Sequence, residues 1–319
     1  MPSVFLRPGK LNNRHDPIRL GAIEDRRSPV VDTLVSAVNV DRDNNGVCSR
    51  RGGRVRRVTG ATHSAWSSPF DRSLGWLVRD SVLYRLNADY TLTALATLTN
   101  NAPMAYEPVN SEIVASNGSD IGWLRSGNFT PFAPTLGDFE ATMPAGQYLA
   151  FLNGVLFSAI GSVLYASKPY NVERRDVRVG IFPFPGYIRM LAAVEDGLWA
   201  ATDKQVVFVS GTGADGLRYQ ERTTAAPPDG AFSVGYEESA QGVRRVVRWV
   251  STEGFCRGFA GGAFETLSDP DVAMPTGSAG KCFHRVVNGI DQYVAVIRNP
   301  VGSDAFVPRS LTVNTITVS

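Results

Sequence analysis

The chain has 319 residues, of which 43% are hydrophobic, and its 31 glycines and 19 prolines are spread throughout. This composition is typical of a folded protein rich in turns and argues against a disordered chain. The formal net charge is only +2, but residues 1–60 hold 12 Lys/Arg against 6 Asp/Glu. Since no apolar run approaches about 18 residues and no charged-then-apolar leader opens the chain, we expect neither export nor a membrane span.

The N-terminal 60 residues are expected to form an irregular arm. Ser28 and Pro29 are a suitable N-cap and first-turn pair, and the apolar residues that follow recur at helical spacing, which predicts one short helix. Residues 37–58 then indicate a hairpin, with a turn rich in Asp, Asn and Gly. The residues assigned to shaping this turn are Asn39, Asp41, Asp43, Asn45 and Gly46.

The same turn matches the first half of a calcium loop. The residues Asp41 to Gly46 fit the pattern DxDxNG, but the twelfth position is Gly52 instead of the glutamate that completes the oxygen shell. A hairpin turn whose side chains bond their own backbone is therefore favoured. Neither the three histidines nor the three cysteines have a spacing typical of a metal site, so we expect no metal.

A basic run follows the turn. It consists of Arg50, Arg51, Arg54, Arg56 and Arg57. These side chains fit non-specific contact with a DNA backbone. They also fit a protein interface, in which arginine pairs with acidic residues of a neighbour, or a solvated strand face. The sequence favours the protein interface and leaves the other two open.

An internal repeat predicts the fold. The segment Leu149–Ser167 recurs 43 positions later, which aligns Gly154 with Gly197 and Val155 with Leu198. Each copy consists of three short apolar runs separated by turns. A period of roughly 40–45 residues is typical of four-stranded propeller blades, which stack because none can bury both faces alone.

Similar strand-rich units extend over most of the chain. They cover residues 74–98, 111–134, 147–168, 190–222, 232–268 and a stretch from about 283. The predicted fold is an all-β propeller of five to seven blades, with a β-sandwich as the alternative. The predicted organisation is an arm at 1–60, a propeller at 61–309 and a separate C-terminal strand at 310–319.

The sequence contains few signs of catalysis. Gly211 to Gly216 satisfies GxGxxG, but the residues after it form a strand pattern, so the helix N-terminus that would hold a pyrophosphate is missing. There is no GxSxG elbow and no P-loop. The sequence therefore predicts a protein without cofactor that is not an enzyme.

The N-terminal segments GKLNNRHDPIRL and VSAVNVDRDNNGVCSRRGG carry a family resemblance. They are similar to the opening of tailed-bacteriophage virion proteins of the tail-nozzle and packaged-DNA-stabilisation type. The matching positions are Gly9, Asn12, Asn13, Ala37, Asn39, Val40, Asp41, Gly46, Arg50, Arg51 and Gly52. A later stretch, residues 206–216, resembles the strand-then-turn segment of these proteins, although Gly213-Ala214 departs from their pattern.

The resemblance implies a structural protein of the phage tail, made in the host cytoplasm and located in the virion. It implies a hexameric ring at the head-to-tail junction or at the distal end of the tail. The implied role of this ring is to help retain the genome or conduct it during ejection. The implied partners are further copies of the chain and the adjoining tail, adaptor or portal proteins. The N-terminal segment and the C-terminal strand are the expected contacts.

Two other functions remain open at this stage. A receptor- or glycan-binding propeller at the tail tip would use aromatic side chains at turns. The candidates are Trp66, Tyr106, Phe129 and Tyr170. A propeller hydrolase would require acidic residues that converge in the fold.

Overall fold

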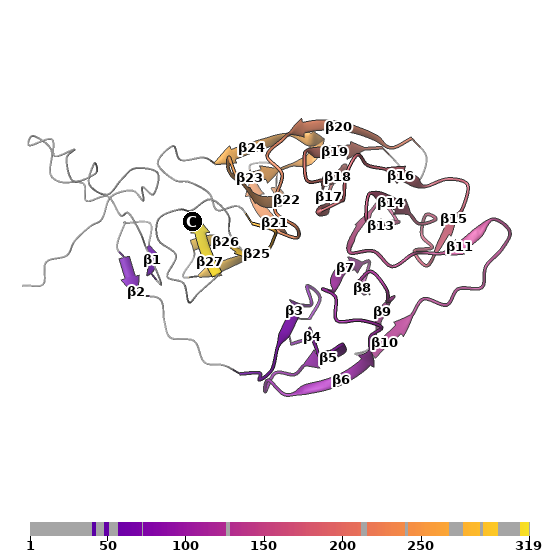
Figure 1. Cartoon of the computed structure of the whole chain (residues 1–319), viewed down its shortest axis with the longest axis horizontal. Helices are drawn as coiled ribbons and strands as arrows, with labels where there is room; N and C mark the ends of the chain where they lie inside the picture. Colours follow the sequence, from indigo (N-terminus) through magenta and orange to yellow (C-terminus); the bar gives the residue numbers. More distant parts are fainter. Residues whose placement is uncertain are drawn as a thin grey trace, which may run out of the picture. The chain divides into compact units, whose positions relative to one another are not determined.

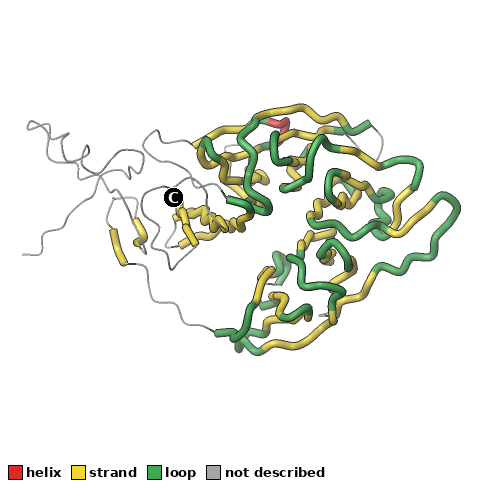
Figure 2. Tube along the Cα trace, in the orientation of Figure 1, coloured by secondary structure: helices red, strands yellow, loops and turns green. Residues whose placement is uncertain are grey.

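The computed structural model describes residues 40–42, 48–50, 57–71, 73–125, 128–211, 216–239, 242–267, 277–287, 290–298 and 313–318. These residues form 27 strands and one short 3-10 helix, Ala260–Gly262. Figure 2 shows strands and loops alternating along this part of the chain, which contains no α-helix. The predicted short helix after Ser28 lies outside the described residues.

The strands are grouped into successive antiparallel meanders (Figure 1). The first contains β3 (Thr62–Ser67), β4 (Gly75–Arg79), β5 (Val82–Leu86) and β6 (Leu92–Thr97). The second contains β7 (Ala105–Val109), β8 (Glu112–Ser116), β9 (Ile121–Arg125) and β10 (Asn128–Pro131). The third contains β12 (Tyr148–Leu152), β13 (Val155–Ile160), β14 (Val163–Ala166) and β16 (Ile181–Pro183).

Three further sheets follow in the same order along the chain. The fourth contains β17 (Met190–Val194), β18 (Gly197–Ala201), β19 (Val206–Ser210) and β20 (Arg218–Thr223). The fifth contains β21 (Phe232–Ser239), β22 (Gly242–Ser251), β23 (Gly254–Gly258) and β24 (Phe264–Leu267). The sixth has three strands, β25 (Ala279–Val287), β26 (Ile290–Arg298) and β27 (Val313–Val318).

The chain divides into two compact units. One unit holds the first four sheets and consists of Val55–Thr224 and Phe259–Gly262; the other holds the fifth and sixth sheets. Within the four-sheet unit, the first strand of the third sheet, β12, contacts β7 on one side and β17 on the other. The last strands, β6, β10 and β20, form the outer edge (Figure 1). This arrangement, with first strands inside and fourth strands outside, is that of propeller blades and confirms the predicted fold.

Two-residue turns join many of the paired strands. Between β12 and β13, Leu152 pairs with Val155, so Asn153 and Gly154 alone form the turn. Both have positive φ, 49° and 81°. An Asn-Gly pair accommodates this conformation at little cost, and its twist matches that of the flanking strands. The sequence therefore specifies the register of this hairpin locally.

The core of several blades is centred on a large side chain of the second strand. Trp76 on β4, Trp199 on β18 and Trp249 on β22 are all fully buried, as is Phe157 on β13. The 43-residue repeat aligns Leu156 with Trp199, but the strand pairing makes Phe157 the equivalent of Trp199, because each is the third residue of its strand after the hairpin turn. The repeat therefore identifies consecutive blades, with an alignment that is wrong by one residue.

The structure places the predicted units within these sheets, with differences at their ends. The first blade begins at β3, upstream of the predicted unit at residue 74. β27 lies within the predicted C-terminal strand at 310–319 and pairs with β26, and β1 (Val40–Arg42) pairs with β2 (Cys48–Arg50) in the predicted hairpin. The strand β20 follows the GxGxxG segment and pairs with β19, so that segment joins two strands, as the turn interpretation requires.

Candidate interaction site

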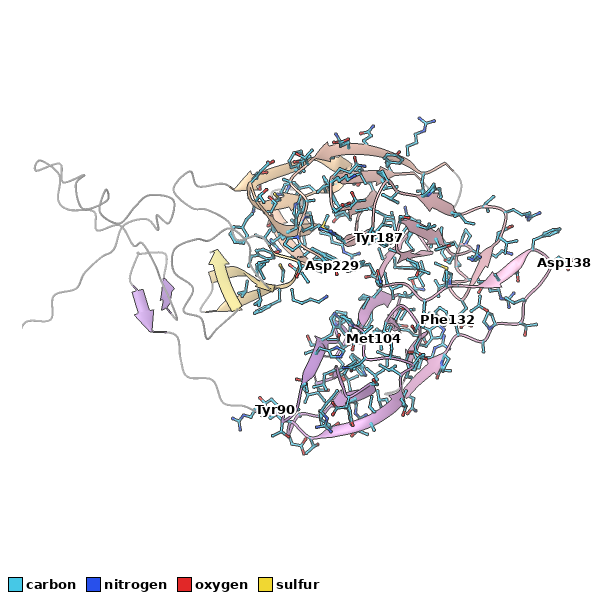
Figure 3. All side chains as sticks on the ribbon, viewed as in Figure 1. Tyr90, Met104, Phe132, Asp138, Tyr187 and Asp229 are labelled. Carbon is cyan, nitrogen blue, oxygen red and sulfur yellow. The ribbon has the colours of Figure 1, made fainter. Side chains whose placement is uncertain are left out.

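A two-stranded ribbon is added to the third blade. β11 (Glu140–Thr142), which precedes β12, pairs antiparallel with β15 (Arg174–Asp176), which lies between β14 and β16. We call residues 132–142 and 174–181 the β11–β15 ribbon; its last residue, Ile181, is also the first residue of β16. Figure 3 shows Asp138 at the outer end of this ribbon, beyond the strands of the blade. The ribbon is an addition to the four-stranded blade pattern.

The ribbon exposes apolar side chains. They are Leu136, Phe139, Val177, Val179 and Ile181. Phe139 is 60% exposed and has a φ of 59°, a backbone conformation that is costly for a bulky residue. Clusters of exposed apolar residues are typical of surfaces that bind another protein. The ribbon is therefore a candidate interaction surface.

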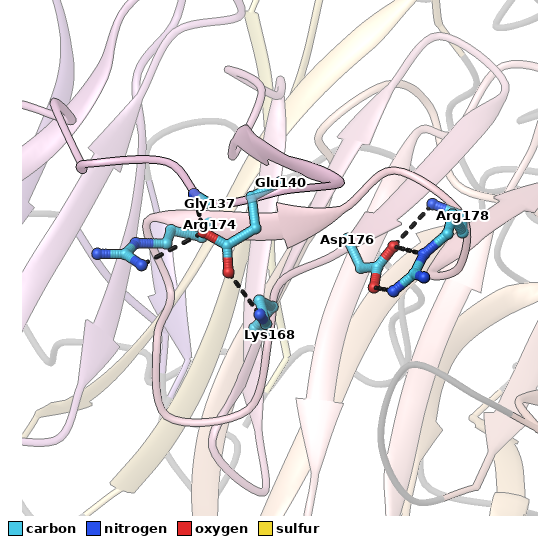
Figure 4. Close-up of polar contacts among 6 residues, drawn as sticks. All are labelled: Gly137, Glu140, Lys168, Arg174, Asp176 and Arg178. Carbon is cyan, nitrogen blue, oxygen red and sulfur yellow. Dashed lines mark hydrogen bonds and ion pairs between the residues drawn. The ribbon is translucent and has the colours of Figure 1, made fainter.

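Ion pairs hold the ribbon in shape (Figure 4). The Glu140 carboxylate accepts hydrogen bonds from Lys168 Nζ at 2.5 Å, from Arg174 Nη1 at 3.3 Å and from the Gly137 amide at 2.8 Å. The hydrogen bonds from Lys168 and Gly137 lower the pKa of Glu140 to about 2. Its carboxyl group therefore stays ionised, and the base of the ribbon stays paired, far below neutral pH.

The far strand of the ribbon has its own charged pair. Asp176 accepts from Arg178 Nη2 at 2.7 Å and from Arg178 Nε at 3.0 Å, which holds the pKa of Asp176 well below its usual range. The guanidinium carbon of Arg178 also lies 4.5 Å from the centre of the Phe139 ring. Arg178 thus links the carboxylate to the exposed aromatic side chain.

Beside the ribbon, the second and third blades form an open pocket of about 290 Å³. Its lining consists of Val109, Asn110, Glu112, Trp123, Arg125, Phe151, Tyr170, Asn171, Val172 and Glu173. The residues come from β7 to β9, from β12 and from the loop between β14 and β15. The pocket therefore brings together segments that are distant in the sequence.

One wall of the pocket is a polar network on β8 and β9. Glu112 and Arg125 lie at the paired ends of these strands and form a two-point ion pair, with Nε to Oε1 at 2.7 Å and Nη2 to Oε2 at 2.8 Å. The Arg125 guanidinium lies 4.3 Å from the Trp123 ring centre. The Trp123 indole donates to Glu173 Oε1 at 2.6 Å. These contacts orient two carboxylates and one guanidinium toward a single opening.

Tyr170 forms the mouth of the pocket. Its side chain is 87% exposed and its φ is 58°. The Tyr170 amide donates to the Gly154 carbonyl at 2.7 Å, and a Cβ on Gly154 would lie 2.8–3.0 Å from three atoms of the tyrosine ring. Only glycine at position 154 therefore lets the ring lie this close to the turn.

The other aromatic candidates belong to the core. Trp66 and Tyr106 stack on each other with ring centres 5.2 Å apart. Both pack against the buried cluster that contains Trp76, Leu83 and Leu124, as does Phe129. Burial raises the pKa of Tyr106 well above its usual value. Of the four aromatic residues that the sequence offered for stacking, Tyr170 alone lies at the pocket.

Most of the predicted arm residues lie outside the described part of the chain. These are Asn39, Asp43, Asn45, Gly46, Arg51, Arg54 and Arg56. Asp41 and Arg50 lie on the paired strands β1 and β2. The Arg57 guanidinium lies 5.3 Å from the Tyr90 ring centre, so one arginine of the run rests on the first blade. DNA contact by this run stays a prediction.

The described residues hold no cluster of three or more His, Cys, Asp or Glu side chains that would bind a metal ion. Within the same residues, no helix has the length and apolar character needed to cross a membrane.

No protein-family model matches the sequence, and no curated protein is similar to it. Among solved structures, the chain is similar to virginiamycin B lyase from Staphylococcus aureus, with 13% identity, 73% of this chain and 76% of that one covered, and a TM-score of 0.46. A gluconolactonase from Xanthomonas campestris shares 11% identity over 73% and 82% of the two chains, with a TM-score of 0.45. The N-terminal domain of Nup159 shares 11% identity over 70% of each chain, with a TM-score of 0.43.

These structures correct one prediction. The sequence predicted a protein that is not an enzyme, whereas two of the similar structures are a lyase and a gluconolactonase. Missing motifs were a weak basis for that prediction, because enzymes and non-enzymes share the same folds and catalytic groups converge only in space. The likeness concerns the fold, and it assigns no reaction or substrate to this chain.

Proposed function

We propose that the protein is a structural subunit of a bacteriophage tail, in which copies of the chain associate into a ring at the head-to-tail junction or the distal tail. The ring contacts adjoining tail, adaptor or portal proteins and helps to retain or conduct the genome. The resemblance of the N-terminal segment supports the virion context. The observation that carries the proposal is the rigid β11–β15 ribbon with its exposed apolar side chains.

The ribbon has the composition of an interface centre. Glu140 is paired with Lys168 and Arg174 of the same blade, and Asp176 is paired with Arg178, so these two carboxylates need no partner from another chain and the exposed apolar side chains remain available for contact. Interface cores are depleted in unpaired charge and enriched in aromatic residues, as at Phe139. A ribbon on one side of a subunit that binds a different surface of the next copy makes a heterologous contact, which closes into a ring when the rotation permits.

Replacing Phe139 by aspartate tests this proposal in the full-length protein. Aspartate tolerates positive φ better than phenylalanine does, so the change removes the apolar ring and adds a charge without straining the ribbon. We expect sedimentation velocity to find rings for the unchanged protein and mainly single chains for Phe139→Asp.

The matched control is Phe70→Asp. Phe70 is 52% exposed and lies in the turn between β3 and β4 of the first sheet, whereas the ribbon is attached to the third blade. We expect this variant to form rings like the unchanged protein. Rings that persist in Phe139→Asp, or that are lost equally in both variants, would rule out the ribbon as the contact between copies.

A further inference from the structure

We propose that the pocket at Tyr170 binds a neutral pyranose unit of a carbohydrate. This goes beyond the proposed role in assembly and assigns a ligand to a site that assembly does not use. The inference rests on the conformation and exposure of Tyr170, on the polar groups around it and on the charge balance of the lining.

The backbone of Tyr170 has a strained conformation. A bulky residue with positive φ is rare, and such residues cluster at functional sites, where surrounding contacts compensate for the strain. Here the hydrogen bond to Gly154 and the close approach of the ring to that glycine hold the strained conformation. The side chain nevertheless contributes little to the core, since 87% of it is exposed. Packing alone does not explain this tyrosine.

An exposed aromatic ring is suited to stack against the apolar face of a sugar ring. The ring of Tyr170 lies close to Gly154, and because the residue is 87% exposed, most of the ring surface is open to a ligand. Tyrosine also combines a large contact area with a hydroxyl that can bond to a polar ligand. The ring thus provides the apolar half of a carbohydrate site.

The polar groups of the proposed carbohydrate site face the same opening as the ring of Tyr170. Sugar hydroxyls both donate and accept, and they need carboxylates, amides and guanidinium groups held in fixed positions. Glu112 and Arg125 orient each other, and the indole of Trp123 fixes one oxygen of Glu173. Among the described residues, the side-chain amides of Asn110 and Asn171 have no hydrogen-bond partner, so both are available to a ligand.

The charge and the volume of the pocket restrict the class of ligand that it can bind. Among the described residues that line the pocket, Arg125 is the sole cation, and Glu112 already neutralises it. An anionic ligand such as a phosphate would meet the Glu173 carboxylate without a free cation to bind it. The volume of about 290 Å³ lies at the lower end of the range for small-molecule sites, which fits one sugar unit. A neutral monosaccharide, free or at the end of a glycan, satisfies these constraints.

Saturation-transfer NMR on the full-length protein tests the proposal. The probes are the methyl glycosides of glucose, galactose, mannose and N-acetylglucosamine, which differ in hydroxyl orientation and in one substituent. We expect transfer from the protein to at least one of them, with the strongest signal from C–H protons on one face of the sugar ring. The absence of transfer to all four would overturn the proposal.

Three variants identify the site. Tyr170→Asn removes the ring and relieves the strain, because asparagine tolerates positive φ; we expect about tenfold weaker binding or more. Tyr170→Phe should bind within a few-fold of the unchanged protein. Tyr187→Ala is the control, since Tyr187 is 73% exposed in the same unit but does not line the pocket. Equal binding by Tyr170→Asn and the unchanged protein would contradict the assignment.

The same variants separate this inference from the proposed assembly. Tyr170→Asn should form rings as the unchanged protein does, because its side chain is not part of the ribbon. Its melting temperature should be no lower than that of the unchanged protein, since the substitution removes the backbone strain at position 170. A variant that lost sugar binding together with its rings or its folded structure would show that Tyr170 has a structural role only, and would overturn the inference.

Discussion

Replacing Trp199 by alanine is expected to destabilise the four-sheet unit by about 3 to 5 kcal/mol, the usual cost of deleting a large buried aromatic side chain. Trp199 is fully buried on β18, and its ring centre lies 5.3 Å from that of Phe208. Its indole N–H donates to the Phe259 carbonyl at 3.0 Å, which fixes the turn segment Phe259–Gly262 on this blade. The substitution removes both the packing and this hydrogen bond.

Urea unfolding followed by circular dichroism measures the effect. Trp199→Phe keeps most of the packing and loses the hydrogen bond, so it should cost about 1 to 3 kcal/mol, which separates the two contributions. Tyr187→Ala, at an exposed position, should change the free energy of unfolding by less than about 0.5 kcal/mol. A Trp199→Ala protein as stable as Tyr187→Ala would contradict the blade core described above.

Replacing Glu237 by alanine is expected to destabilise the unit of the fifth and sixth sheets by about 3 to 5 kcal/mol, because it removes the counter-charge of a buried arginine. Glu237 Oε1 accepts from Arg248 Nη2 at 2.6 Å and from Arg257 Nη1 at 3.2 Å. The Arg248 side chain is 7% exposed and that of Glu237 is 13% exposed. Without the carboxylate, the guanidinium of Arg248 remains buried and uncompensated.

The same pair predicts a pH dependence. Burial raises the pKa of Glu237, but the hydrogen bond and charge of Arg248, followed by those of Arg257, lower it by more, so the net shift is downward. The ionised form thus stabilises the fold fully above the pKa of an unfolded glutamate, about 4.3, and this stability is lost as the pH falls below it. The stability difference between the unchanged protein and Glu237→Gln should therefore shrink between about pH 6 and pH 3.

Glu253→Gln is the control for this series, because Glu253 lies exposed in the turn between β22 and β23. Its stability should follow that of the unchanged protein at every pH. A Glu237→Gln protein whose stability deficit stays constant from pH 6 to pH 3 would show that the ion pair with Arg248 does not stabilise the fold.

The blade architecture could be predicted from the sequence where local signals agree. The 43-residue repeat identifies β13 and β18 as corresponding strands because a glycine precedes or begins each apolar run, but Gly154 lies in the turn before β13 whereas Gly197 is the first residue of β18, so the alignment is shifted by one residue. The strand β3 was missed because its sequence, THSAWS, is largely polar and its side chains are half-buried or exposed. β16 was missed for another reason. The ribbon strand β15 separates β16 from β14 in the sequence, and β15 and β16 are each only three residues long.

The pocket could not be predicted, because its parts meet only in the folded chain. Glu112 and Arg125 are 13 residues apart and pair because β8 and β9 are antiparallel, whereas Glu173 reaches Trp123 from another blade. Tyr170 was named from the sequence together with three aromatic residues that belong to the core. The positive φ of Tyr170 and its contact with Gly154 distinguish it, and neither is encoded in a local pattern.

The mass of the full-length protein in solution tests the proposed assembly most directly. Light scattering at low and high salt should give about six times the 34.5 kDa of one chain at both concentrations, because an apolar contact at the ribbon is little affected by screening. A mass of 34.5 kDa at both salt concentrations would contradict the proposal that copies of this chain associate into a ring.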